Sequence, residues 1–331
     1  MFDEIDRKIL RALRYHPRAS FRLIGEVAGV SEQTAARRYQ ALRREGVMRV
    51  VGLINPEVHG LARWITRIRC RPDRVAPLAD ALTRRPDIAY VGLASGGSEI
   101  ICVIHSPVDT PRDDILLRQL PKAASVLDVS IDLLIHPFGT AGASEWSGYG
   151  GHLTPDQVAR LTADRQATPT GPLQPLTAED TPLLDALAED GRTTHTRLAE
   201  LTGWSKARVA RRLDALESSG ALSYDVDLLP ERLGHHLNAI LWLRAAPAHL
   251  QRVGEELAAH EEVAFAGAMS GDHNIMVVAN CLDAEDFYRY LTTRVAAVPG
   301  IDAYSVSIRV RRLKQAASLI AQGRLIPPGP A

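Results

Sequence analysis

Residues 18–46, RASFRLIGEVAGVSEQTAARRYQALRREG, decide the fold, because they recur as residues 192–220, RTTHTRLAELTGWSKARVARRLDALESSG. Without a gap, both copies share a first arginine, a Glu-x-x-Gly-x-Ser segment, an Arg-Arg pair and a final glycine. Outward from there, Asp6 matches Asp180, and after one inserted residue Ser95-Gly96 matches Ser270-Gly271. The chain is therefore one long unit duplicated in tandem, and not an array of short repeats.

The first part of each copy has the pattern of three helices. Apolar residues recur at helical spacing in each predicted segment. Between the second and third segments, Gly29 and Gly203 supply a left-handed helix end, and Ser31 and Ser205 supply the N-cap of the next helix. A helix, a short glycine-containing turn and a second helix are typical of the helix-turn-helix motif.

The third helix of each copy combines an apolar stripe with an arginine-bearing opposite face. Ala35, Tyr39 and Leu42 form the stripe in the first copy. In a major groove, arginine can donate two hydrogen bonds to guanine, glutamine can pair with adenine, and a threonine methyl can contact thymine. We predict DNA contacts from Ser31, Gln33, Thr34, Arg37, Arg38 and Arg44 in the first copy, and from Ser205, Lys206, Arg208, Arg211 and Arg212 in the second.

Charge distinguishes the two predicted helix-turn-helix domains, although the whole chain carries 39 basic and 39 acidic side chains. Residues 1–50 hold eleven basic and six acidic side chains, whereas residues 176–222 hold six basic and eight acidic ones. An excess of positive charge favours binding to the phosphate backbone. We therefore expect the first domain to bind DNA more strongly. The alternative for either helix is an ordinary solvated face.

From residue 61 the pattern changes to short apolar runs that predict an α/β domain. The order βαββαβ is the ferredoxin-like arrangement, whose sheet has one face without helices. We expect the sheet of the other copy to cover that face, since the linker keeps it at high effective concentration. In the first copy we predict strands at 61–70, 87–95, 99–105 and 125–136, and helices at 73–84 and from Asp109 to about Lys122. In the second copy we predict strands near 237–245, 261–270, 274–281 and 300–311, and helices near 248–259 and 283–297.

The predicted fold class is α+β, a winged-helix-like helix-turn-helix plus a ferredoxin-like βαββαβ domain, with the pair duplicated in tandem. The linker is rich in Gly, Ser and Pro, with a short helix starting at Thr154, and the tail is expected to fray from Gly323. The predicted domains are 1–58 and 176–232 for the helix-turn-helix parts, 59–138 and 233–315 for the effector and oligomerisation parts, 139–175 for the linker, and 316–331 for the tail.

Composition restricts the class of protein. Hydrophobic residues make up 46% and charged residues 24%, as in a soluble globular protein, and no apolar run reaches the roughly 18 residues of a membrane span. The first residues, MFDEIDRKIL, have acids where a secretory signal carries bases, so we expect a cytoplasmic protein. Cys70, Cys102 and Cys281 are far apart and are expected to be reduced core thiols. Metal-ligand spacing and phosphate-loop motifs are absent, so we expect no catalytic residue, metal or cofactor.

The first copy contains Asp3-Glu4-Ile5-Asp6, Arg18, Ser31, Arg38, Glu45-Gly46, Asn55-Pro56 and Gly60. In these residues the chain resembles the leucine-responsive regulatory protein/AsnC family of transcriptional regulators. The resemblance covers both copies and implies a helix-turn-helix that binds promoter DNA, joined to a βαββαβ domain that senses an amino acid or another small molecule. Members are usually single units that form dimers and larger assemblies. A tandem chain would therefore be a covalent pseudo-dimer with an asymmetric operator, and a further homo-oligomer is expected.

The family's effector domain carries a Gly-x-x-Asp turn between its second and third strands, near the effector. Here the turn reads Gly96 to Glu99 in the first copy and Gly271 to Asn274 in the second, so that the aspartate is replaced in both. The resemblance implies an effector site at these four residues. The alternative is that the glycines serve only the turn itself.

A second resemblance belongs to a different class. Sirohaem decarboxylases have the same two-domain unit in paired or fused halves, and the strand that starts at His273 is similar to one of theirs. The matching first-copy segment starts at Ser98 and has neither histidine nor an aromatic residue. An enzyme has no use for two arginine-bearing helix faces. We therefore predict a regulator, with a tetrapyrrole decarboxylase as the alternative. A further possibility is an effector sensor that does not bind DNA and only pairs with related regulators.

Overall fold

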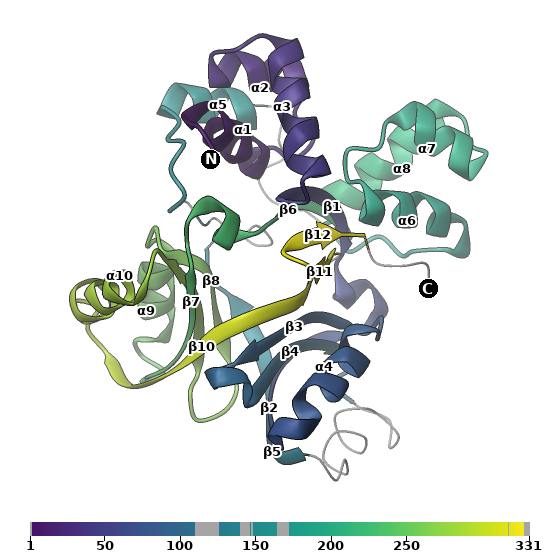
Figure 1. The fold of residues 1–331 in the computed structure, drawn as a ribbon. Helices are drawn as coiled ribbons and strands as arrows, with labels where there is room; N and C mark the ends of the chain where they lie inside the picture. Colours follow the sequence, from purple (N-terminus) through teal and green to yellow (C-terminus); the bar gives the residue numbers. More distant parts are fainter. Residues whose placement is uncertain are drawn as a thin grey trace. The chain divides into compact units, whose positions relative to one another are not determined.

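The computed structural model describes residues 2–109, 126–139, 146, 148–163, 172–316 and 318–327. The chain forms two compact units (Figure 1). One unit contains residues 1–60, 150–229 and 321–331, with both helix-turn-helix domains. The other contains residues 61–149 and 230–320, with both βαββαβ domains. Domains of the same type are thus grouped together, although they are far apart in the sequence.

The two helix-turn-helix domains share a two-stranded sheet. Strands β1 and β6 pair antiparallel, with Val51 opposite Asp225, its own equivalent in the second copy. The pairing is therefore symmetric about this position. The first domain consists of α1 (Glu4–Tyr15), α2 (Phe21–Ala28), α3 (Glu32–Arg44) and β1 (Met48–Ile54), and the second of α6 (Thr181–Glu189), α7 (His195–Thr202), α8 (Lys206–Ser218) and β6 (Leu222–Leu228).

Each βαββαβ domain has the predicted ferredoxin-like strand order, β3-β4-β2-β5 in the first copy and β8-β9-β7-β10 in the second. The predicted α+β class is confirmed. The predicted helix from Asp109 to Lys122 lies, except for Asp109 itself, outside the described residues. The elements are β2 (Ala62–Cys70), α4 (Val75–Thr83), β3 (Ile88–Ala94), β4 (Glu99–Ser106) and β5 (Val126–Pro137), then β7 (Leu237–Ala245), α9 (Leu250–Ala258), β8 (Val263–Met269), β9 (Ile275–Cys281), α10 (Ala284–Arg289), β10 (Ile301–Gln315) and β11 (Ser318–Ala321).

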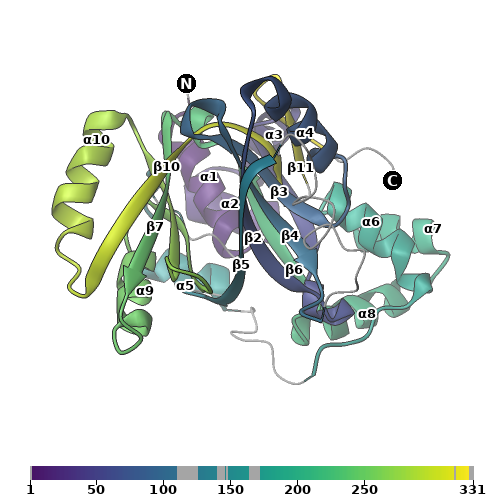
Figure 2. The same cartoon turned by 90° about the horizontal axis from the view of Figure 1, so that it is seen from below.

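The two sheets cover each other, as the helix-free faces predict. They are joined at both edges, because β5 pairs with β8 and β10 pairs with β3. Figure 2 shows β10 running from beside β7 toward β3. Both junctions have the same register: Leu134 lies opposite Met269, and their equivalents Arg309 and Ala94 lie opposite each other. Apolar side chains from both sheets, including Trp242, fill the space between them. Helices α4 and α9 cover the outer faces.

The linker is not only the flexible connector that its composition predicts. Trp146 and Tyr149 are buried in the βαββαβ unit, with ring centroids 5.2 Å apart. The expected helix forms as α5 (Pro155–Thr162) and packs on α1. Its Gln157 side chain donates to the Val27 carbonyl at 2.8 Å. A few large side chains thus anchor a segment that is otherwise rich in small and polar residues.

The expectation that the tail frays from Gly323 is wrong for residues 324–326, which form β12 (Arg324–Ile326). The Leu325 amide donates to the Gly46 carbonyl at 2.8 Å, and the Leu325 side chain is buried. The tail therefore packs beside the end of α3.

Replacing Leu161 with alanine is expected to lower the free energy of unfolding of the helix-turn-helix unit by about 2–3 kcal/mol. The reason is that Leu161 lies on the buried face of α5 and is 1% exposed. Urea unfolding followed by circular dichroism measures the change, and hydrogen exchange should accelerate along α5. Asp156→Asn on the exposed side of α5 is the matched control. Equal urea midpoints for the two variants would show that α5 is only a tether.

Candidate nucleic-acid interface and effector-domain site

The predicted turn and N-caps form in both helix-turn-helix domains. Gly29 and Gly203 have φ of 74° and 71°, the left-handed region that ends α2 and α7. The hydroxyls of Ser31 and Ser205 accept the amides of Thr34 and Arg208, both at 3.2 Å. The two serines therefore start α3 and α8, and their contact to DNA stays a prediction.

The arginine-bearing faces of α3 and α8 are exposed, as their periodicity predicts. In the first domain Gln33, Arg37 and Arg44 are exposed, and Thr34 is half-buried. In the part of the chain that the structure describes, Arg37 and its equivalent Arg211 have no ion-pair partner. The opposite stripe, with Tyr39 at its centre, is buried. The exposed faces in the second domain include Lys206, Arg208 and Arg211.

Arg38 and Arg212 occupy equivalent positions, but their guanidinium groups are used inside the protein. Arg38 donates to Asp6 at 2.9 Å and to Asp3 at 2.7 Å. Arg212 makes two bonds to the buried Asp180 carboxylate, at 2.8 and 2.7 Å. Burial raises the pKa of Asp180, but the bonds from Arg212 and Thr177 outweigh burial, and the net shift is downward. We correct the prediction: these arginines fix the recognition helix to the start of its domain.

Arg208 is held more loosely. Its guanidinium carbon lies 4.1 Å from the centroid of the Trp204 ring, and one of its nitrogens pairs with Glu179. Both charged side chains are more than half exposed, so the pair contributes little stability. Arg208 therefore stays available to another acidic group.

The two helix-turn-helix domains are joined by reciprocal arginine contacts that the sequence analysis missed. Arg18 donates to the carbonyls of Gly191 and Thr193, at 2.5 and 3.3 Å. Its equivalent Arg192 donates to the carbonyls of Pro17 and Ala19, both at 2.7 Å. Burial lowers the pKa of Arg192. The matching of Arg18 with Arg192 in the duplication was the available signal, although it does not reveal that each side chain crosses to the other domain.

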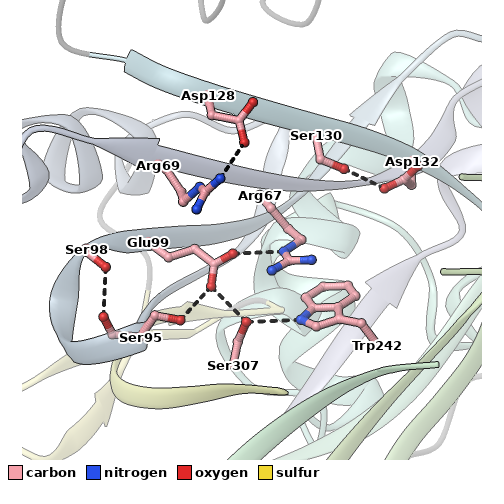
Figure 3. Close-up of polar contacts among 10 residues, drawn as sticks. All are labelled: Arg67, Arg69, Ser95, Ser98, Glu99, Asp128, Ser130, Asp132, Trp242 and Ser307. Carbon is pink, nitrogen blue, oxygen red and sulfur yellow. Dashed lines mark hydrogen bonds and ion pairs between the residues drawn. The ribbon is translucent and has the colours of Figure 1, made fainter. Parts of the chain in front are cut away.

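The predicted effector residue Glu99 lies between the two sheets and is 3% exposed (Figure 3). Its carboxylate accepts from Arg67 Nε at 2.8 Å, Ser95 Oγ at 2.9 Å and Ser307 Oγ at 2.8 Å. Arg67 also stacks on Trp242, with its guanidinium carbon 4.3 Å from the ring centroid. The sequence analysis missed Arg67, Ser307 and Trp242, because only the pairing of the sheets brings them to Glu99.

Among the described residues, Asn274, the equivalent of Glu99, bonds to the main chain of its own domain and not to the other sheet. Its amide clamps the main chain of Ala245, accepting from the nitrogen at 3.0 Å and donating to the oxygen at 2.8 Å. Gly271 has φ of 95°, and a Cβ built there would clash with a carboxylate oxygen of Asp132, whereas a Cβ at Gly96 would have open space. The two turns that the sequence equates are therefore chemically distinct.

Comparison with known proteins decides the family. An AsnC-type helix-turn-helix domain is matched at residues 2–43 and 176–217, and a Lrp/AsnC ligand binding domain at residues 238–319. The HTH-type transcriptional regulator LrpA of Pyrococcus abyssi is 33% identical over 133 residues, which are 94% of that protein and 40% of this chain. The chain belongs to the Lrp/AsnC family.

Other Lrp/AsnC relatives agree. LrpA of Pyrococcus horikoshii is 32% identical and LrpA1 of Halobacterium salinarum 28% identical, each over 133 residues that cover 94% of the relative and 40% of this chain. The helix-turn-helix domain is thus matched in both copies and the ligand binding domain in the second, while the duplicated sequence and strand order extend the repeat to the first effector domain.

The crystal structure of the siroheme decarboxylase NirDL has a TM-score of 0.63 to this Lrp/AsnC chain and covers 95% of it, with 93% of its own chain aligned. The two are 13% identical, so the likeness shows a shared fold alone. In the part of the chain that the structure describes, no helix has the length and apolar character needed to cross a membrane.

Proposed function

We propose that this chain is a sequence-specific DNA-binding transcriptional regulator that carries a complete pair of recognition helices and is not an enzyme. The observation that carries the proposal is the exposure of Arg37 and Arg211 at equivalent positions of α3 and α8, in domains that Arg18 and Arg192 hold together. Exposed arginines at this place on a recognition helix suit base edges in a major groove.

The proposed division of roles follows the geometry. Gln33, Thr34 and Arg37 would contact bases from α3, with Arg44 on phosphate at its end. Lys206, Arg208 and Arg211 would act from α8. Because the first domain carries more positive charge, its contribution to affinity should be larger.

The proposed effector is a small molecule, with an amino acid as the first candidate. The match to a ligand binding domain supports this class. Since the side chains of Glu99 and Asn274 are bonded within the protein, the effector would contact the turns at Gly96 and Gly271 through their main chain. Differential scanning fluorimetry with each amino acid in turn tests this proposal, and a dose-dependent rise in melting temperature is the expected result.

Binding of the purified protein to a randomised DNA pool, followed by sequencing of the bound fraction, tests the DNA-binding function. We expect enrichment of two unequal half-sites in inverted orientation, and an affinity that falls steeply as salt rises. No enrichment above the input pool, or binding that is insensitive to salt, would contradict the proposal.

The shared fold with NirDL supports one alternative, a decarboxylase that acts on a tetrapyrrole. His273 lies half-buried beside the Gly271 turn, but its equivalent Ser98 offers no imidazole. Titration with sirohaem distinguishes the two functions: a stable visible absorption band together with loss of a carboxylate would favour the enzyme.

A further inference from the structure

The network around Glu99 connects the two sheets on one side only (Figure 3). The duplication equates Glu99 with Asn274, Arg67 with Trp242 and Ser307 with Asp132, so these three positions carry different residue types in the two copies, whereas Ser95 is matched by Ser270. Two sheets that pair with the same register at both junctions thus carry different polar side chains on their inner faces.

We infer that the inner face of the first sheet is a pairing-specificity surface, which fits the second sheet and rejects another copy of itself. The inference goes beyond the proposed function, because it holds whether or not the chain binds DNA. Arg67 and Glu99 are its central residues, and Ser307 of the second sheet is their partner.

The pairing that is present satisfies every member of the network. Ser307 Oγ accepts from Trp242 Nε1 at 3.0 Å and donates to Glu99 at 2.8 Å. Arg67 neutralises the Glu99 carboxylate and covers the face of the Trp242 indole. Since Glu99 is almost completely buried, loss of these donors would leave a carboxylate without hydrogen-bond partners between the sheets.

Pairing of two first sheets in the same arrangement would place Asp132 where Ser307 now lies. Glu99 would then exchange a hydroxyl donor for a second carboxylate, at a distance where like charges disfavour ionisation of both groups. A second Arg67 would take the place of Trp242, so that two guanidinium groups would replace a cation and an aromatic ring. Self-pairing of the first sheet is thus penalised at both contacts.

Pairing of two second sheets brings no such charges together, since Trp242, Asn274 and Ser307 are all neutral. Stoichiometry nevertheless disfavours it. Each chain has one sheet of each kind, so pairing two second sheets leaves two first sheets that can pair only with each other. A penalty on self-pairing of the first sheet is therefore enough to direct both sheets into the mixed pair. The linker anchored by Trp146 and Tyr149 then favours closure within one chain.

Two double-cysteine variants of the full chain report which sheets pair. Leu134→Cys with Met269→Cys bridges the first sheet to the second, because these residues face each other across β5 and β8. Ala94→Cys with Leu134→Cys bridges only two first sheets from different chains, since Ala94 is the equivalent of Met269. On non-reducing gels we expect an intrachain cross-link for the first variant and no covalent dimer for the second. A covalent dimer of the second variant in comparable yield would overturn the inference.

Ser307→Asp in the cross-linking background tests the charges themselves. It creates the carboxylate pair of self-pairing, and the yield of the intrachain cross-link should fall at least several-fold. Asp132→Ser, at the equivalent position, is the matched control and should leave the yield unchanged. Adding Glu99→Gln to Ser307→Asp should restore most of the yield, because an amide and a carboxylate can share a hydrogen bond. A yield that does not fall, or a loss that Glu99→Gln leaves in place, would show that the network does not set the pairing.

Discussion

Replacing Arg37 with alanine is expected to weaken binding to a selected operator roughly 10- to 100-fold at fixed salt, within the ~1–3 kcal/mol of a bidentate arginine–guanine contact. Arg37 is exposed on α3, and in the described residues no ion pair competes for its guanidinium. Fluorescence anisotropy with labelled operator DNA measures the change. Discrimination against a base-substituted half-site should fall together with affinity, since the lost contact is to a base.

Two further variants serve as a charge control and as a comparison between the two domains. Arg252→Ala on α9 removes the same charge from the βαββαβ unit and should change affinity less than twofold. Arg211→Ala should weaken binding less than Arg37→Ala, because its domain carries more acidic than basic side chains. Equal losses for Arg37→Ala and Arg252→Ala would mean that Arg37 acts only through net charge.

Replacing Arg192 with methionine is expected to lower the free energy of unfolding of the helix-turn-helix unit by about 3 kcal/mol. Arg192 donates to two main-chain carbonyls at 2.7 Å and lies 4.5 Å from the centroid of the Phe21 ring. Methionine fills similar volume, but it leaves both carbonyls without their charged donor. Urea unfolding followed by circular dichroism is the measurement.

The reciprocal substitution, Arg18→Met, should cost somewhat less, since one of its two bonds is 3.3 Å long. Arg197→Met on α7 is the control, because that arginine is 60% exposed and pairs only with Glu200 in the described residues. The Arg192 variant should also bind operator DNA more weakly, since α3 and α8 are then no longer held in a fixed relation. Unchanged stability in both anchor variants would show that β1 and β6 alone join the domains.

Local pattern was enough to predict the helices, the turns and the exposed faces of α3 and α8. It was not enough for Arg38 and Arg212, because an arginine on the flank of a recognition helix can serve either DNA or its own domain. The carboxylates that bind these arginines, Asp6 and Asp180, are matched positions of the duplicated sequence. Only the packing of α1 and α6 shows that these carboxylates reach the arginines.

The effector turn shows a different limit. A glutamate in a glycine-containing turn predicts an exposed group that faces a ligand, whereas Glu99 is buried by strand β10 from the other copy. Composition likewise concealed the anchoring of the linker, since Trp146 and Tyr149 are two aromatic residues within a segment of small ones. In both cases the missing information is a contact between residues far apart in the sequence.

The symmetric β1–β6 pairing also affects how the occupancy of promoter DNA would depend on the concentration of the protein. A regulator that dimerises to bind loses its dimer as it is diluted, so that promoter occupancy falls with the square of subunit concentration. Here both strands belong to one polypeptide, so the β1–β6 pairing does not depend on the concentration of the chain. Halving the number of molecules in a cell would then halve the binding-competent species, which allows control even when few copies are present.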